Sequence, residues 1–228
     1  MPLLSILLRV RERVRRQRMA RLLTAFPIRP EWRVLDVGGT IDLWLLCPVR
    51  PRLVLLNMPR GADSARLPGV EIVYGDGTSL PFADQSFDLV FSNSVIEHVG
   101  DATRQARFAA EIERVAPRCW VQTPDRWFPI EAHLWTPFIH FLPRRWQRFI
   151  VPRFSIWQLL TRCSPDQRQY YLDHYLDEIR LLSATDIRRL FAGATILQER
   201  FLGLSKSIIA IGGRTNAPSV DASTERPT

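Results

Sequence analysis

The chain has 228 residues, of which 46% are hydrophobic and 24% are charged. This length and composition suit one domain of ordinary size with a buried core, and they exclude collagen-like, disulfide-dense and wholly disordered proteins. The net charge of +8 is concentrated in residues 1–33, with nine Arg against two Glu, and in residues 132–165, with five Arg and no acid, so a uniformly basic nucleic-acid binder is not indicated.

The N-terminal segment predicts a basic amphipathic helix over residues 1–30. Residues 1–8 are apolar and the following stretch is rich in arginine, the reverse of the order in a secretory signal peptide. Apolar residues then recur at helical spacing and predict one apolar face, formed by Met19, Leu22, Leu23 and Phe26. This face either covers a sheet that follows it or anchors the helix on an anionic membrane surface.

Five short apolar runs predict strands that are buried on both faces, as in a parallel sheet. They lie at residues 33–37, 53–58, 70–74, 89–92 and 119–123. Between the last two runs, apolar residues recur at helical spacing over residues 102–115. This alternation predicts an α/β domain with a Rossmann-like, doubly wound and mostly parallel sheet.

Residues 125–182 interrupt the alternation and predict a helical and aromatic insertion. Its first part, residues 125–165, combines four Trp and five Phe with arginines. These aromatic residues form either the insertion's own core or a lid over an apolar or amphipathic small molecule. Because Trp and Arg also suit a membrane interface, residues 1–24 and 132–165 are candidates for contact with an anionic membrane surface.

The C-terminal part predicts the end of the sheet. Ser183 is placed to cap a short helix over residues 184–191, which Gly193 ends. Two further strands are predicted at residues 195–201 and 207–212, close enough to pair as a hairpin-like edge. The domain is therefore expected to span residues 31–214, and residues 215–228 lack apolar periodicity and predict a disordered tail.

Polar residues and glycines follow the ends of four predicted strands. In an open α/β sheet, ligands bind outside the carboxyl ends of the strands, where glycines let the backbone approach the ligand and a following helix offers unpaired N–H groups. At such an edge Asn57 can reach the hydroxyls of a ribose, and Asp76 can accept a hydrogen bond from an adenine amine. The candidate binding residues are Asp36, Gly38, Gly39, Thr40, Asn57, Met58, Asp76, Gly77 and Asn93.

The chain resembles the class I S-adenosylmethionine-dependent methyltransferases, in particular the type 11 methyltransferase domain. Four segments in residues 33–124 carry the resemblance: VLDVGGT, LVLLNM, GDGTSLPFADQSFDLVFSNSVIEHV and AAEIERVAP. It implies a seven-stranded sheet in which the last two strands complete the edge, one of them antiparallel. It also implies S-adenosylmethionine as cofactor, with its methionine and ribose beside Asp36, Gly38 and Gly39, its ribose hydroxyls on Asn57, its adenine at Asp76 and Gly77, and its methionine near Asn93.

Two features depart from the family's pattern. The family motif is D-x-G-x-G-x-G, and Thr40 and Asp42 stand at its second and third glycines. Asn57 stands where an acidic residue is expected to hold both ribose hydroxyls. Two functions therefore stay open: a methyltransferase that acts on O, N or C of a small or lipid-like acceptor, and an inactive methyltransferase fold that serves as a peripheral-membrane binding or interaction module.

Methyl transfer from a sulfonium donor needs mainly alignment of donor and acceptor, although an oxygen or nitrogen acceptor can also require a base. The catalytic candidates are His98, at the end of the fourth strand, and His133, which follows Glu131 by two residues. Neither histidine shows metal-ligand spacing with the others, so no metal site is predicted.

The cysteine content and the hydropathy favour a cytoplasmic protein, either free or at the inner face of the membrane. The three cysteines (Cys47, Cys119 and Cys163) are widely spaced and form no CxxC pair, so a disulfide framework is not expected. No apolar run approaches the roughly 18–20 residues that span a bilayer. A small-molecule or lipid-like substrate is the expected partner, and nucleic acid is not.

Overall fold

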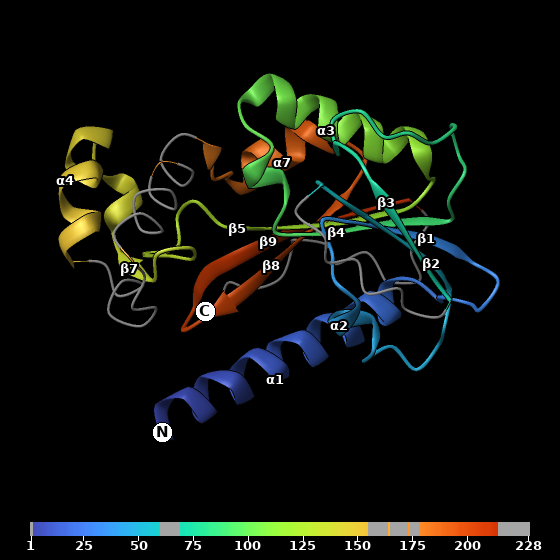
Figure 1. Ribbon diagram of the computed structural model, residues 1–228, viewed down its shortest axis with the longest axis horizontal. Coiled ribbons are helices and arrows are strands. Elements are labelled where there is room, and N and C mark those ends of the chain that lie inside the picture. The colour runs from blue at the N-terminus through green and yellow to red at the C-terminus, as the bar shows by residue number, and fades with distance from the viewer. Residues whose placement is uncertain (1, 60–68, 155–163, 165–172, 174–177, 214–228) are drawn as a thin grey trace, which may run out of the picture.

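The computed structural model describes residues 2–59, 69–154, 164, 173 and 178–213 (Figure 1). The predicted tail at 215–228 and part of the predicted insertion lie outside these residues. Within the described part of the chain, no helix is long and apolar enough to cross a membrane.

One seven-stranded sheet forms the centre of the molecule, in the order β3-β2-β1-β4-β5-β9-β8. The pairs β1–β2, β1–β4, β2–β3 and β4–β5 are parallel, whereas β9 is antiparallel to both β5 and β8. The predicted doubly wound, mostly parallel sheet is therefore confirmed. Its strands are β1 (Arg33–Val37), β2 (Arg52–Asn57), β3 (Val70–Tyr74), β4 (Leu89–Asn93), β5 (Cys119–Pro124), β8 (Thr195–Phe201) and β9 (Leu204–Gly212).

Helices cover both faces of this sheet (Figure 1). One face carries α3 (Ala102–Val115) and α7 (Ala184–Leu190), and the other carries α1 (Pro2–Ala25) and the single-turn α2 (Ile41–Trp44). A capping box formed by Ser183 and Asp186 begins α7, as the sequence predicts.

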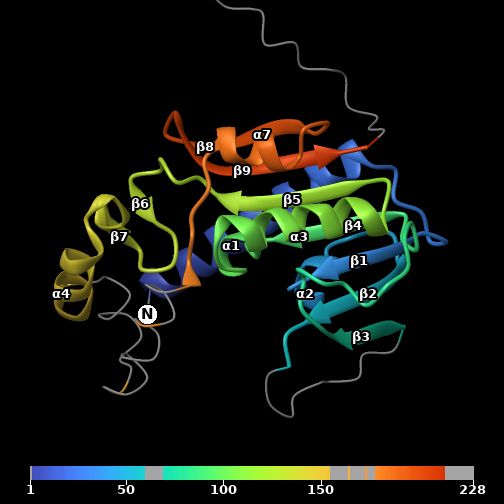
Figure 2. The same ribbon diagram turned by 90° about the horizontal axis from the view of Figure 1, so that it is seen from above.

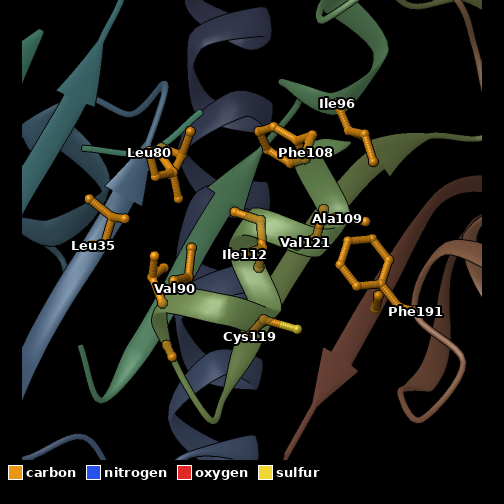
Figure 3. Packing of buried hydrophobic residues seen from close by; sticks show 14 of the residues in the cluster. Leu35, Leu80, Val90, Ile96, Phe108, Ala109, Ile112, Cys119, Val121 and Phe191 are labelled. Carbon is orange, nitrogen blue, oxygen red and sulfur yellow. The ribbon is translucent and has the colours of Figure 1, made fainter. Parts of the chain in front are cut away.

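The alternation of side chains along the strands supplies two apolar layers. On one face Leu35, Val90 and Val121 pack beneath Phe108 and Ile112 of α3, as Figure 3 shows. A second cluster lies on the opposite face, because successive side chains of a strand point to opposite faces of the sheet. There the strand residues Val34, Leu89, Phe91 and Trp120 pack with Met19 and Leu22 at the C-terminal end of α1 and with Phe26 directly after it. The predicted apolar face of the N-terminal helix thus covers the sheet.

Strand β3 departs from the sequence prediction. The apolar run at 70–74 predicts burial on both faces, yet β3 is the edge strand, and Tyr74 is 46% exposed. The prediction of full burial is wrong here because hydropathy does not distinguish a central strand from an edge strand.

The described part of the insertion lies to one side of the sheet (Figure 2). It contains a two-stranded ladder of β6 (Ile130–Glu131) and β7 (Thr136–Pro137), the 3₁₀ turn η2 (Ile139–Phe141), and α4 (Arg144–Phe154). Its small core is aliphatic, formed by Leu134, Ile139, Val151 and Ile179. Several aromatic residues are instead exposed, namely Trp127, Trp135, Phe138, Phe141, Trp146 and Phe149. Trp157 lies outside the described residues.

Candidate functional site

A cavity lies at the carboxyl ends of the neighbouring strands β1 and β4. The chain adds β2 and β3 on one side of β1 and then β4 and β5 on the other side, so the strand order switches between β1 and β4. This switch point is where open α/β sheets bind ligands. The cavity volume is about 190 Å³, below the roughly 300–1,000 Å³ typical of small-molecule sites. Its lining residues are Arg15, Arg18, Asp36, Gly38, Gly39, Thr40, Leu43, Phe91 and Asn93.

The turn after β1 requires glycine at two positions. Gly38 has φ +73°, and a Cβ atom there would lie 2.4 Å from a methyl group of Val95. At Gly39 a Cβ atom would lie within about 2 Å of the Asp36 carboxylate. Thr40, in contrast, has an ordinary extended backbone with φ −125°. The threonine at the second motif position therefore costs the chain no backbone strain.

Asp36 is the buried acid of the cavity, with 1% of its surface exposed. Its Oδ2 accepts a hydrogen bond of 2.8 Å from the indole N–H of Trp44 in α2. Its Oδ1 has no hydrogen-bond partner among the described residues. Burial raises the pKa of Asp36 to about 7, although the bond from Trp44 partly opposes this. A ligand with a donor group would satisfy the remaining oxygen.

Four predicted binding residues, Asn57, Met58, Asp76 and Gly77, are not among the residues that line this cavity. The side-chain amide of Asn57 donates to the carbonyl of Gly39 at 3.2 Å, so it ties β2 to the glycine turn. Met58 is 58% exposed, and neither residue lines the cavity. Gly77 packs against the ring of Phe108, where a Cβ atom would lie 2.8 Å from a ring carbon.

Asp76 is held by its own neighbours. Its Oδ2 lies 2.7 Å from a guanidinium nitrogen of Arg104, and its Oδ1 accepts from the backbone N–H and the hydroxyl of Thr78. Burial alone would raise the pKa of Asp76, but the bonds from Thr78 and Arg104 outweigh it and lower the pKa. Asp76 thus stabilises the loop after β3 and does not line the cavity.

Arg18 of α1 is a cavity residue that the sequence analysis missed. Its guanidinium donates to the side-chain oxygens of Asn93 and Gln122 at the ends of β4 and β5, and it lies 2.5 Å from Glu199 of β8. Burial would raise the pKa of Glu199, but the bond and charge of Arg18, together with Ser207 and Arg21, lower it. The local sequence gives no sign of this pairing, because β8 (TILQERF) mixes polar and apolar residues and Glu199 is followed directly by Arg200.

A second polar cluster contains the two catalytic candidates. His98 ends the 3₁₀ turn η1 (Ile96–His98), which closely follows β4, and the loop between β6 and β7 supplies His133. Their Nε2 atoms are 3.1 Å apart, and the two rings are nearly perpendicular at 82°. The structure therefore joins the histidines, although 35 positions separate them in the chain. Neither lines the cavity beside the glycine turn.

Glu131 orients His133 through the ring nitrogen Nδ1, which points away from His98. One carboxylate oxygen lies 2.7 Å from His133 Nδ1, and the other accepts from the backbone N–H groups of His133 and Leu134. Burial would lower the pKa of His133, but the hydrogen bond and charge of Glu131, with the charge of Glu97, outweigh it and raise the pKa. Of the other histidines, His140 contacts the carbonyl of Arg126.

Glu97 completes this cluster and was not among the candidate site residues. It is fully buried, and its Oε2 accepts a hydrogen bond of 3.0 Å from Thr123. Burial raises the pKa of Glu97 to about 7, against the opposing charge of His133. The sequence contained Glu97 in the EHV segment, but no spacing pattern linked it to His133.

Comparison with known proteins supports the fold and the family resemblance. A family model described as a methyltransferase domain matches residues 55–118. A protein of Encephalitozoon cuniculi (strain GB-M1), named "Putative methyltransferase", is 44% identical over 63 residues. That match covers 28% of this chain and 28% of the relative.

Two solved structures show the same fold. The PH0226 protein of Pyrococcus horikoshii OT3 has a TM-score of 0.53 and 16% identity, over 90% of this chain and 91% of that one. The N-terminal domain of EvdMO1, crystallised in the presence of SAH and D-fucose, has a TM-score of 0.51 and 15% identity, over 88% and 82%. The resemblance to the class I methyltransferases is confirmed, with a methyltransferase domain model matching residues 55–118.

Proposed function

We propose that this protein is an S-adenosylmethionine-dependent methyltransferase that acts on an oxygen or nitrogen atom of a small or lipid-like acceptor. The observation that carries the proposal is the glycine turn at the switch point of the sheet, where the buried Asp36 has one carboxylate oxygen without a partner among the described residues. A buried acceptor of this kind is costly unless a donor reaches it. The matching methyltransferase domain model supports the same conclusion.

The residues around the cavity suit the polar groups of the cofactor. Asp36 Oδ1 would accept a hydrogen bond from the ammonium group of the methionine part. Arg15, whose side chain is 33% exposed and lies 3.6 Å from Asp42, would pair with the carboxylate. Because the cavity is smaller than usual ligand sites, binding requires the arginine side chains of α1 to move. The cofactor would supply the methyl group as an electrophile on its sulfonium.

The second cluster would serve the acceptor. A base must lie within hydrogen-bond reach of the proton that it removes. Glu131, His133 and His98 form a hydrogen-bonded chain that can take a proton from a hydroxyl or amine. His98 stands five residues after Asn93, which lines the cavity, so the donor and acceptor sites would be neighbours at one edge of the sheet.

The insertion supports an amphipathic acceptor. The segment that carries His133 also exposes Trp127, Phe138 and Phe141, and the rings of Trp127 and Phe141 stack with centroids 6.0 Å apart. Such an apolar surface beside a polar centre fits a molecule with both characters.

Binding of S-adenosylhomocysteine tests the donor site. Calorimetry should give one site per chain, and Arg15→Gln should weaken binding about tenfold or more because it removes a charge-assisted hydrogen bond. Arg16→Gln is the matched control, since Arg16 pairs with Glu12 on the exposed side of α1. Absence of both heat and thermal shift at millimolar ligand would overturn the proposal.

A second candidate function is a methyltransferase fold without cofactor that binds an anionic membrane surface. The small cavity and the exposed aromatic residues near arginines favour it. Flotation with phosphatidylserine vesicles tests it with Phe138→Ser and Phe141→Ser, and Tyr74→Ser on the distant edge strand is the control. Vesicle binding that only the first two variants abolish, in a chain that does not bind S-adenosylhomocysteine, would support this candidate; cofactor binding would exclude it.

A further inference from the structure

We propose that Glu97, His98 and His133 form a binding site for one divalent transition-metal ion, with zinc as the best match, and that Glu131 positions His133 for this role. Each of the three residues offers a ligand atom, and these atoms lie within 4.8 Å of one another. The ion binding itself does not depend on the proposed methyltransferase function. Only the role of the ion toward the acceptor rests on it.

The distance between the two histidines suits a shared ion. Two nitrogen ligands at 2.0–2.1 Å from a tetrahedral zinc ion lie about 3.3 Å apart. The Nε2 atoms of His98 and His133 are 3.1 Å apart, so an ion could enter with only a small movement of the rings.

His133 contacts a carboxylate through its other ring nitrogen, as metal-binding histidines usually do. A ligating histidine usually donates its other ring N–H to a carboxylate, which fixes the ring and its tautomer. His133 Nδ1 lies 2.7 Å from Glu131, whose other oxygen accepts two backbone N–H groups. Glu131 is 1% exposed, so the protein holds this carboxylate rigidly. Nε2 of His133 is thereby the nitrogen that faces His98.

Glu97 supplies the third ligand. It is fully buried, and Thr123 satisfies only Oε2, while Oε1 has no hydrogen-bond partner among the described residues. A buried carboxylate oxygen without a donor is costly, and a cation within reach removes that cost. This unpartnered oxygen is independent of the distance between the histidines and leads to the same conclusion.

The types of ligand select the metal. Two imidazoles and one carboxylate match zinc and similar transition metals, whereas calcium and magnesium prefer oxygen ligands alone. Zinc sites in which three protein ligands leave a fourth position open are the catalytic type. With the Nε2 atoms of both histidines on the ion, the histidines would no longer take the acceptor's proton themselves. The ion would instead lower the pKa of a bound acceptor hydroxyl, so that methyl transfer to oxygen could start from the alkoxide.

Metal titration of the full chain tests the proposal. Chelator-treated protein should bind one equivalent of Zn²⁺ by calorimetry, and Co²⁺ should give the intense visible absorption of a tetrahedral site. His98→Gln and His133→Gln should abolish saturable binding, and Glu131→Gln should weaken it about 10–100-fold. His140→Gln is the matched control, because His140 belongs to the same segment and contacts Arg126 instead. Circular dichroism would show that the variants fold.

Two results would overturn the proposal: no saturable binding of Zn²⁺ or Co²⁺ by the wild-type chain, or binding that survives both histidine substitutions. The first result would leave the cluster as a purely hydrogen-bonded network. Titration of the same metal-free protein with S-adenosylhomocysteine distinguishes this failure from failure of the proposed function, because the donor cavity is lined by other residues.

Discussion

Replacing Asp36 with Asn removes a buried carboxylate almost without changing its shape. The indole of Trp44 can still donate to the amide oxygen, so the 2.8 Å hydrogen bond survives. The folded protein holds the pKa of Asp36 at about 7, against an ordinary value of 3.8, because the side chain is buried. At about 1.4 kcal/mol per pKa unit, ionising Asp36 in the folded protein costs about 4 kcal/mol of stability.

The sign of this effect follows from the raised pKa. Below about pH 3.8 Asp36 is protonated in both the folded and the unfolded chain, so its ionisation costs no stability. As the pH rises from about 3.8 to about 7, the unfolded chain ionises first, and the free energy of unfolding falls until the folded protein also ionises. Asparagine does not titrate in this range. Asp36→Asn should therefore stabilise the protein by about 4 kcal/mol at pH 8 and by about 2 kcal/mol at pH 5.

Urea unfolding of both proteins at pH 5 and pH 8 measures this difference. Asp42→Asn is the control, since the Asp42 side chain is 55% exposed and a surface substitution changes stability by less than about 0.5 kcal/mol. The same Asp36 variant should bind S-adenosylhomocysteine more weakly, because the amide no longer offers two acceptors. A variant that is less stable at pH 8, or equally affected at both pH values, would refute the burial argument.

Three further substitutions test the supports of the site by urea unfolding. Ser183→Ala removes the N-cap of α7 and should cost about 1 kcal/mol; an unchanged midpoint would contradict the capping role. Gly38→Ala should lower the free energy of unfolding more than Gly203→Ala does. Both glycines have positive φ, but only at Gly38 would the new Cβ atom lie 2.4 Å from a side chain. Equal losses of stability would mean that this contact relaxes freely. Glu199→Gln leaves Arg18 without its buried carboxylate and should cost about 3 kcal/mol, whereas a cost below about 1 kcal/mol would place the pair in solvent.

Short-range patterns predicted most of the sheet. The apolar runs at 33–37 and 119–123 are strands because buried parallel strands need continuous apolar residues. The predicted helix at 102–115 has the observed bounds. Boundaries were less accurate where hydropathy changes gradually: β9 begins at Leu204, three residues before the predicted start. Burial of β3 was mispredicted, because an edge position depends on strand order.

The prediction of the site was more uneven. The glycines after β1 were recognisable because a turn with positive φ is a local property of the backbone. The ribose role of Asn57 and the adenine role of Asp76 stay predictions, and the structure adds that Gly39 and Arg104 already contact these two side chains. A residue's position at the edge of a sheet indicates which groups it can reach but not which of them it binds.

By itself, the sequence determined the seven strands of the sheet, the helices of the N-terminal segment, of residues 102–115 and of the segment after Ser183, and the glycine turn after β1. These depend on apolar periodicity, caps and backbone conformation, which act over a few residues. Only the tertiary structure decided that Arg18 meets Glu199, 181 positions away, and that His98 meets His133. Both contacts depend on how the layers pack. A charged or imidazole side chain has no local sequence pattern that identifies its partner, because the partner comes from a distant segment of the chain.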